Sequence, residues 1–184
     1  VWARLPMQDS TSAASQFKPP VWQKAKSASS KLHGSWAFIA PNFIVLLRGS
    51  NTARIRPDPP DCPIWRRKPL IVVRMAVVHI DQMSRRDHYM IMRQATMSHF
   101  AAPTIVSEGP ATIPTNRRLK AYRGTFTGYR DGKPWRSSLT TVDYGYWSGR
   151  MTAAYPESEA AEAEKYLGVL LAEIRAQRPK APKR

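Results

Sequence analysis

Few residues in this sequence are of the types that perform covalent or metal chemistry. It contains one cysteine, Cys62, and four histidines, His33, His79, His88 and His99. On a helix, His88 and His99 would share a face but lie about 16 Å apart, which is too far for one metal ion. Cys62 lies in the proline-rich segment "PPDCPIW", with no sign of a helix N-terminus that would activate its thiol. We therefore predict no metal site, no cofactor and no catalytic cysteine.

The short motifs that specify a reaction are also missing from this sequence. It contains no GxGxxG, GxxxxGK[ST], GxSxG or HExxH pattern. Asp131 and Asp143 flank one expected strand, but both are better explained as turn-forming residues. A protein that is not an enzyme is therefore favoured, although an enzyme with a site assembled from distant residues stays open.

Charge is the strongest compositional feature. The chain has 29 Lys and Arg residues against 13 Asp and Glu residues, a net charge of +16. Such a charge attracts anionic partners such as nucleic acid, anionic membrane or an acidic protein surface. The candidate anion contacts concentrate in one region: Arg117, Arg118, Lys120, Arg123, Arg130, Lys133 and Arg136.

Aromatic residues alternate with these basic residues. Tyr122, Phe126, Tyr129 and Trp135 lie among them, and a basic, aromatic sheet surface can neutralise phosphates and stack on bases. The alternative is the solvated basic face of an ordinary sheet, which applies if the aromatic side is covered by a helix.

The N-terminal region differs from the rest of the chain. Its first 57 residues contain a single acid, Asp9, and are rich in Ser, Ala and Lys. We expect residues 1–35 to be a flexible basic extension, either an untargeted tail or an organellar transit segment. The single cysteine fits a reducing intracellular compartment, either the cytoplasm or, with a transit segment, an organelle. No apolar run is long enough to predict a transmembrane helix.

The middle of the chain alternates strand and loop signals. Residues 42–48 and 70–80 are predicted strands, joined by a proline-rich loop at 56–69. A helix is expected at about 84–100, with Ser84 as its N-cap, and the three prolines and one glycine of 101–116 then break the helix. Five methionines occur in this region, either as core filler or as part of an adaptable apolar groove: Met75, Met83, Met90, Met92 and Met97.

The C-terminal half predicts a three-stranded antiparallel meander over 118–129, 134–144 and 146–155. Asp131-Gly132 is a strong hairpin signal, because a type I′ turn needs positive φ at both central residues. We expect this meander to have one apolar side. Residues 156–178 predict a helix, with glutamates at its start and an apolar stripe that would pack against that side.

This order of elements resembles the PsbP/Mog1-like domain, an α/β/α sandwich. The resemblance rests on "GKPWRSSLTTVDYGYWSGRMTAAYP" followed by "ESEAAEAEKYLGVLLAEI" and spans about residues 36–176. Members of that family are mostly binding, assembly or chaperone-like proteins without a common catalytic site. Many bacterial members are exported lipoproteins, but this sequence shows no lipobox or signal, and its proline loop and charge are unusual for the group. No site residue is carried over.

We therefore predict a single α+β domain over residues 36–178, with an antiparallel sheet and helices packed on it, followed by a disordered basic tail at 179–184. The favoured function is a non-enzymatic binding or assembly protein, chaperone-like or accessory, that acts through a protein interface. The alternative is a nucleic-acid-associated protein, such as a ribonucleoprotein component, that uses the basic extension and the 117–136 hairpin. The oligomeric state is not predicted.

Overall fold

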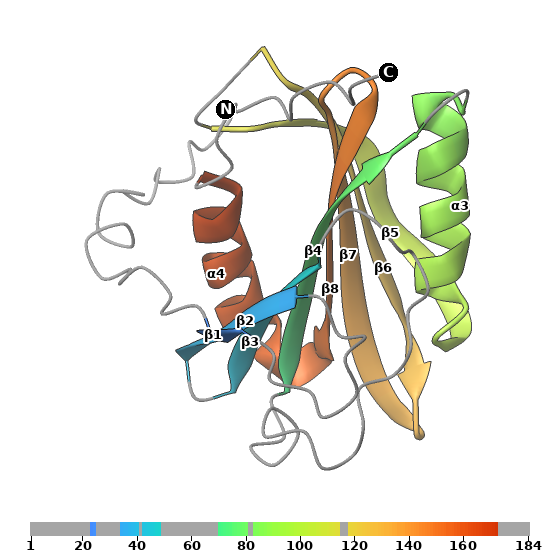
Figure 1. Ribbon diagram of the computed structural model, residues 1–184. Helices are drawn as coiled ribbons and strands as arrows, with labels where there is room; N and C mark the ends of the chain where they lie inside the picture. Colours follow the sequence, from blue (N-terminus) through green and yellow to red (C-terminus); the bar gives the residue numbers. More distant parts are fainter. Residues whose placement is uncertain are drawn as a thin grey trace, which may run out of the picture.

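The computed structural model describes residues 23–24, 34–40, 42–48, 70–80, 83–114 and 118–172 (Figure 1). The elements in chain order are β1 (Gln23–Lys24), β2 (Gly34–Ala40), β3 (Phe43–Arg48), β4 (Ile71–His79), α3 (Arg85–Met97), β5 (Ala101–Thr112), β6 (Lys120–Arg130), β7 (Lys133–Asp143), β8 (Trp147–Pro156), a 3₁₀ turn (Glu157–Glu159) and α4 (Ala160–Ala172).

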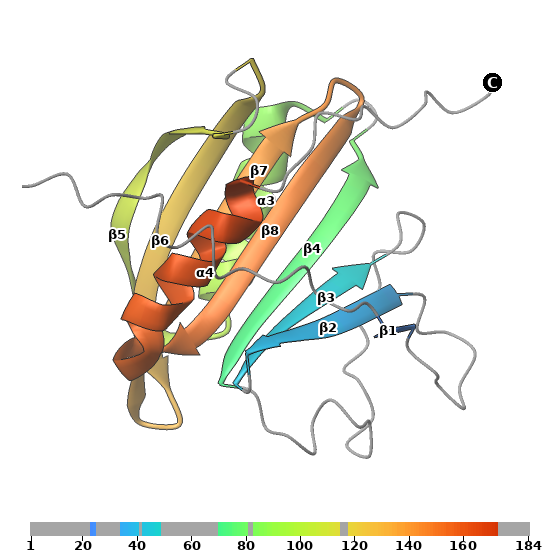
Figure 2. The same cartoon turned by 90° about the vertical axis from the view of Figure 1, so that its left-hand side faces the viewer.

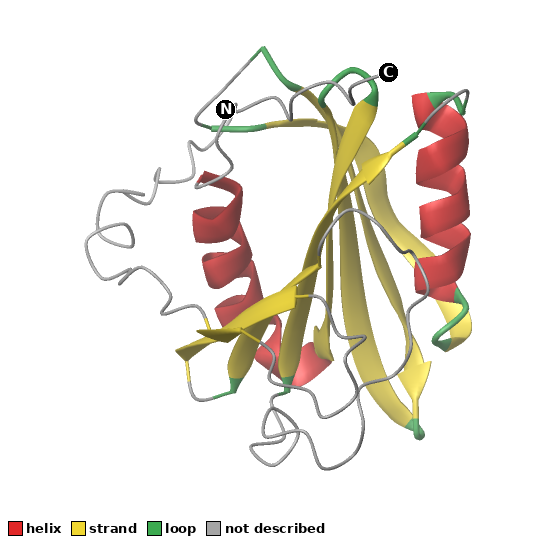
Figure 3. Ribbon diagram, in the orientation of Figure 1, coloured by secondary structure: helices red, strands yellow, loops and turns green. Residues whose placement is uncertain are grey.

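Within this part of the chain, eight strands form one sheet in the order β1-β2-β3-β4-β8-β7-β6-β5 (Figure 2). Neighbouring strands are antiparallel, except for the parallel pair β3–β4. Helices α3 and α4 lie on opposite faces of the sheet (Figures 1 and 3). The predicted α+β class and the α/β/α layering are thus confirmed.

Most predicted elements are found within a few residues of their expected bounds, including both helices and all three meander strands. The predicted loop at 56–69 and the last predicted residues of the second helix, 173–178, lie outside the described residues. The helix does end before residues 101–116, but the sequence did not predict that residues 101–112 form strand β5. This strand contains Pro103 and Pro110, and proline is uncommon in strands because it lacks a backbone N–H. β5 is the last strand in the sheet order, and a terminal strand tolerates proline because the missing N–H can lie on its unpaired side.

The N-terminal part of the sheet overlaps the predicted extension. Gln23 and Lys24 form β1, which pairs with Trp36 and Ser35 of β2. The predicted domain boundary at residue 36 therefore falls inside β2, which begins at Gly34. Residues 1–22, 25–33 and the tail at 179–184 lie outside the described residues.

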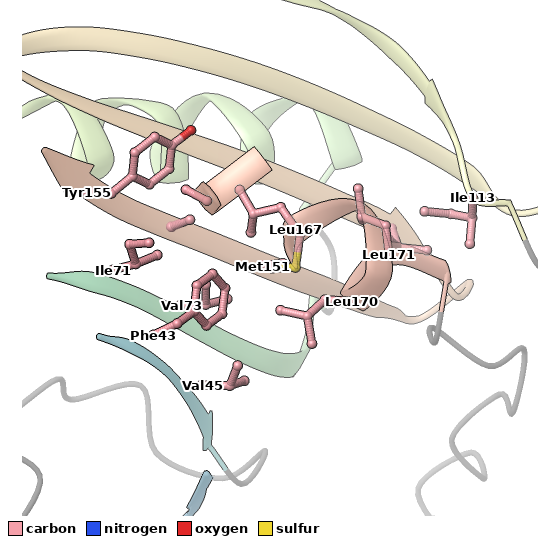
Figure 4. Close-up of a cluster of buried hydrophobic side chains, with 13 residues drawn as sticks. Phe43, Val45, Ile71, Val73, Ile113, Met151, Tyr155, Leu167, Leu170 and Leu171 are labelled. Atoms are coloured by element: carbon pink, nitrogen blue, oxygen red, sulfur yellow. The ribbon is translucent and has the colours of Figure 1, made fainter. Parts of the chain in front are cut away.

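Helix α4 closes the larger of the two apolar layers (Figure 4). Ala163, Leu167 and Leu170, which belong to its predicted apolar stripe, are buried. They pack against alternate residues of three central strands: Phe43, Val45, Ile71, Val73, Met151, Ala153 and Tyr155. Each fully buried aliphatic or aromatic side chain contributes about 1.5–3 kcal/mol, so this layer is a main source of stability.

Two arginine–glutamate pairs fasten the start of this helical segment to the meander. Arg123 Nη2 lies 2.7 Å from Glu164 Oε2, and Arg136 donates from two nitrogens to Glu157. The Tyr155 hydroxyl donates to the other oxygen of Glu164 at 2.7 Å. Because these groups are half-buried, their hydrogen bonds are stronger than those of fully exposed ion pairs.

The meander has two apolar sides, so the prediction of a single one is wrong. Thr140 pairs with Met151, which places the even-numbered residues of β7 on the α4 side of the sheet. Leu139 therefore points to the opposite side, where it forms a second buried cluster with Phe126 of β6 and Tyr89 of α3. The small polar residues Ser138 and Thr140 made the α4 side of β7 look solvent-facing in the sequence.

Glycines of β6 let α3 and the chain after it approach the sheet. Gly124 and Gly128 flank Phe126 on the α3 side. A Cβ atom at Gly128 would lie 2.6 Å from Phe100 Cβ and 3.0 Å from the Ala101 carbonyl oxygen, and one at Gly124 would overlap the Tyr89 hydroxyl. Both positions therefore need a residue without a side chain.

A Gly128→Ala substitution is expected to lower the free energy of unfolding by about 1–3 kcal/mol, the usual cost of overpacking. The cost arises because Phe100 Cβ is fixed to the backbone and cannot rotate away from the new methyl group. Urea denaturation measures the change. Gly109→Ala is the matched control, because a Cβ there meets no atom within 4 Å. Equal effects of the two substitutions would contradict the close approach.

A Thr140→Val substitution is expected to raise the free energy of unfolding by about 1 kcal/mol. The Thr140 side chain is fully buried, and its hydroxyl has no hydrogen-bond partner among the described residues. Valine has nearly the same shape and removes the unsatisfied hydroxyl. Thermal denaturation measures the change, and Thr104→Val is the control. The Thr104 hydroxyl is hydrogen-bonded to that of Thr127 at 2.8 Å, so its removal should not raise the free energy of unfolding. A less stable Thr140→Val protein would refute this prediction.

Candidate functional site

Helix α3 is anchored at its N-terminus by its own cap and by an ion pair. The Ser84 side chain accepts a hydrogen bond from the Asp87 backbone N–H at 3.1 Å, as the sequence predicted. Arg85 Nε lies 2.6 Å from Asp143 Oδ2 at the end of β7. The helix therefore has a fixed position over β6 and β7.

A second set of contacts joins the middle of α3 to the terminal strand β5. The Tyr89 hydroxyl donates to Glu108 Oε1 at 2.7 Å, and Arg93 Nε lies 3.0 Å from the same oxygen. Burial, followed by the hydrogen bond to Glu108, raises the pKa of Tyr89 far above its ordinary value of 10. The tyrosine thus stays a proton donor at all physiological pH values, and its ring packs edge-on against Tyr122 at 4.6 Å.

The remaining side of α3 borders a shallow groove, which we call the α3–β5 groove. It encloses about 490 Å³ and is lined by Met90, Ile91, Arg93, Gln94, Met97, Ser98, Phe100 and Pro103. The lining residues of α3 recur at helical spacing and form a stripe beside the sheet-facing residues His88, Tyr89 and Thr96. The groove is therefore open to solvent along one flank of the helix and is mostly apolar.

Large apolar side chains are exposed on both elements that border the groove. Met90 and Ile91 are 43% and 52% exposed, and Ile105 and Val106 of β5 are 43% and 53% exposed. Ile105 pairs with Phe126 and so lies on the α3 side of the sheet, close to Pro103 along the strand. Grouped exposed apolar side chains of this kind mark interaction surfaces more often than isolated ones do.

The first residues of β5 have an unusual backbone. Ala102 has a φ of 46°, in the left-handed region that non-glycine residues rarely adopt, and it directly precedes Pro103. The register between β5 and β6 then shifts twice, between Ala101 and Thr104 and between Ile105 and Ser107. These irregularities bend the terminal strand beside the groove.

The methionines were expected either to fill the core or to line an adaptable apolar groove, and the structure shows examples of both. Met92 and Met97 pack against the buried cluster of Tyr89, Phe126 and Leu139, as core filler would. Met90 is exposed in the groove, and Met97 also lines it. The methionines were thus a signal for the groove in the sequence, but Ile91, Phe100 and the exposed part of β5 were missed.

The seven predicted anion contacts do not form one surface. Arg117 lies outside the described residues, and Arg118 is exposed just before β6. Arg123 and Arg136 lie on the α4 side, where each is paired with a glutamate. Three others alternate to the opposite side, Lys120 at one end of β6 and both Arg130 and Lys133 at the hairpin tip. Arg130 lies 5.0 Å above the ring of Trp135, so this aromatic residue is already in contact with a cation.

The described histidines do not converge. The His79 ring packs edge-on against Trp147 at 4.9 Å. His88 belongs to α3 and is buried, whereas His99 is exposed. Among the described residues, no group of three His, Cys, Asp or Glu side chains is arranged to hold a metal ion. The same part of the chain includes no helix long and apolar enough to cross a membrane.

Comparison with known proteins gives no sequence family and only distant structural similarities. No protein-family model matches the chain, and no curated protein matches it. One similar solved structure is the Saccharomyces cerevisiae Ran-binding protein Mog1p, with 7% sequence identity and a TM-score of 0.43. The similarity covers 88% of this chain and 86% of that chain. Another is LpqN of Mycobacterium tuberculosis, involved in cell envelope biogenesis, at 13% identity and a TM-score of 0.41 with 92% and 79% covered.

A Pseudomonas aeruginosa protein of unknown function is similar over 54% of this chain and 67% of its own, at 9% identity and a TM-score of 0.45. The Mog1-like proteins that the order of elements resembles are thus among the similar solved structures. At these identities and TM-scores the likeness concerns the fold alone.

The buried His88 is expected to make stability depend on pH. Burial, followed by the positive charge of Arg150, lowers the pKa of His88 below its ordinary value of 6.5. The unfolded chain therefore binds a proton at this residue more readily than the folded chain does. The contribution of His88 to the free energy of unfolding should be fully present above pH 6.5 and should be lost as the pH drops from 6.5 through the lowered pKa.

Chemical denaturation at a series of pH values between neutral and mildly acidic measures this slope. His88→Gln should flatten the slope, whatever its effect on stability at neutral pH. The exposed His99, replaced by Gln, is the control and should leave the slope unchanged. Parallel slopes for the parent protein and the His88→Gln variant would show that His88 is not responsible.

Proposed function

We propose that this protein is a non-enzymatic binding protein that recruits a partner protein through the α3–β5 groove. The observation that carries the proposal is the set of exposed apolar side chains on the two elements that border the groove, Met90 and Ile91 on α3 and Ile105 and Val106 on β5. Exposing these side chains to water is unfavourable, and a partner that covers them gains about 25 cal/mol for each Å² of apolar area buried.

The position of the groove suits a binding role. Its two walls are held by the Tyr89–Glu108–Arg93 contacts and by the packing of Phe100 on Gly128. Its surface residues, in contrast, include methionines, whose flexible side chains adapt to different apolar partners. A rigid frame with adaptable lining keeps the loss of conformational entropy on binding small.

The nucleic-acid interpretation has less support from the geometry. Arg123 and Arg136, two of its predicted contacts, are paired with Glu164 and Glu157 on the α4 side. Their guanidinium groups would have to exchange these carboxylates for phosphates. The groove, moreover, is lined mainly by apolar side chains and contains one aromatic residue, Phe100, whereas single strands are bound by several stacked aromatics.

Site-specific photo-crosslinking tests the proposal. A benzophenone amino acid replaces Ile91, which is 52% exposed, and the full chain is irradiated in extract of its source organism. A discrete protein adduct is expected, and it should disappear when Met90→Asp is added to the same chain. Benzophenone in place of Ala161, exposed on α4, is the control and should not give that adduct.

Two results would contradict the proposal. The same adduct from Ile91 and Ala161 would show that the groove is not selective. An adduct that nuclease returns to the size of the free chain would instead support the nucleic-acid interpretation.

A further inference from the structure

The charges around the α3–β5 groove are mostly basic. Arg93 forms part of its wall. Phe100 packs on Gly128, and Ala101 pairs with Tyr129, so the end of the groove lies beside the β6–β7 hairpin. At the tip of that hairpin, Arg130 and Lys133 lie opposite each other in the β6–β7 register, and both side chains are on the α3 side of the sheet.

Acidic side chains near the groove are few among the described residues. Glu108 accepts the hydroxyl hydrogen of Tyr89 and is paired with Arg93, so its charge is compensated. Asp131, in the hairpin turn, offsets one of the two tip cations. The glutamates that follow β8 belong to the opposite layer: Glu157, Glu159, Glu162 and Glu164.

The net charge of the whole chain, +16, argues against a second copy as the occupant of the groove. Two copies that brought these basic surfaces together would repel each other. The same field attracts an acidic segment and raises its rate of association. The apolar lining requires that this segment also carry apolar side chains.

We propose that the α3–β5 groove binds a partner segment in which apolar side chains are flanked by acidic residues. The apolar side chains enter the groove between α3 and the start of β5. The acidic residues lie toward Arg130 and Lys133 at the hairpin tip. This inference rests on the proposed function and adds the chemistry of the partner.

A random peptide library displayed on phage, selected against the full chain, tests this chemistry directly. Each enriched peptide is then synthesised, and its affinity for the parent protein is measured by fluorescence anisotropy at about 0.05 M and about 0.5 M NaCl. Only peptides that lose binding to the Ile91→Asp variant are counted as groove ligands. Ala161→Asp adds the same charge on α4 and should leave their binding unchanged.

Groove ligands are expected to be rich in Asp and Glu next to Leu, Ile, Met or aromatic residues. Their dissociation constants should rise about three- to ten-fold in the Arg130→Gln, Lys133→Gln double variant, the size expected for two exposed charge contacts. A similar rise is expected at the higher salt concentration, because screening weakens such contacts.

The outcomes separate this inference from the proposed function. Groove ligands that lack acidic residues, or that bind the double variant as tightly as the parent protein, would overturn the acidic chemistry and leave the groove as a binding site. A selection in which every enriched peptide binds the Ile91→Asp variant undiminished would overturn both. Circular dichroism and thermal denaturation verify that each variant is folded, which is expected because Ile91, Arg130 and Lys133 are all exposed.

Discussion

The close contact between Phe100 and the backbone of Gly128 is the constraint on which the α3 layer depends. Phe100 ends the segment after α3, and its Cβ occupies the space where any other residue at 128 would carry a side chain. Gly124 provides the same room for the Tyr89 hydroxyl, which then reaches Glu108 on β5. Two absent side chains on β6 therefore set how closely α3 lies on the sheet and where the groove along its flank opens.

The two helical layers are held in different ways. The α4 layer is broad and apolar, and its arginine–glutamate pairs lie at the border of a large buried cluster. The α3 layer has a smaller cluster of Tyr89, Phe126 and Leu139, supported by polar contacts at Glu108 and Asp143. Much of the apolar surface of α3 and β5 thus stays outside the core. This asymmetry makes the α3 side the one suited to a partner.

Local signals in the sequence were sufficient for most of the fold. Asp131-Gly132 fixed the position of the hairpin, and both residues have the positive φ that the turn requires. Ser84 and the apolar stripe of α4 located the helices. Strand β5 was missed because its two prolines are acceptable only in a terminal strand, and strand order follows from long-range pairing that no local pattern contains.

The candidate site was less accessible to sequence reasoning than the fold. Basic residues 117–136 are close in the chain, but alternation along β6 and β7 sends their side chains to opposite sides of the sheet. The groove joins α3 to the start of β5, and its existence depends on how α3 is rotated on the sheet. Only the methionine cluster hinted at it.

The position of β4 has a consequence for how the chain folds. This strand lies between β3, to which it is parallel, and β8, with Met75 opposite Met151. The hairpins β5–β6, β6–β7 and β7–β8 close over short loops. The second neighbour of β4, strand β8, lies far along the chain, so this pairing forms only after a long segment has been closed. A nascent chain emerging from the ribosome would therefore leave the β8-facing edge of β4 unpaired until residues 147–156 have been synthesised. During that interval the apolar run "LIVVRMAVV" lacks its β8 partner, which makes it the segment of this fold most exposed to incorrect pairing.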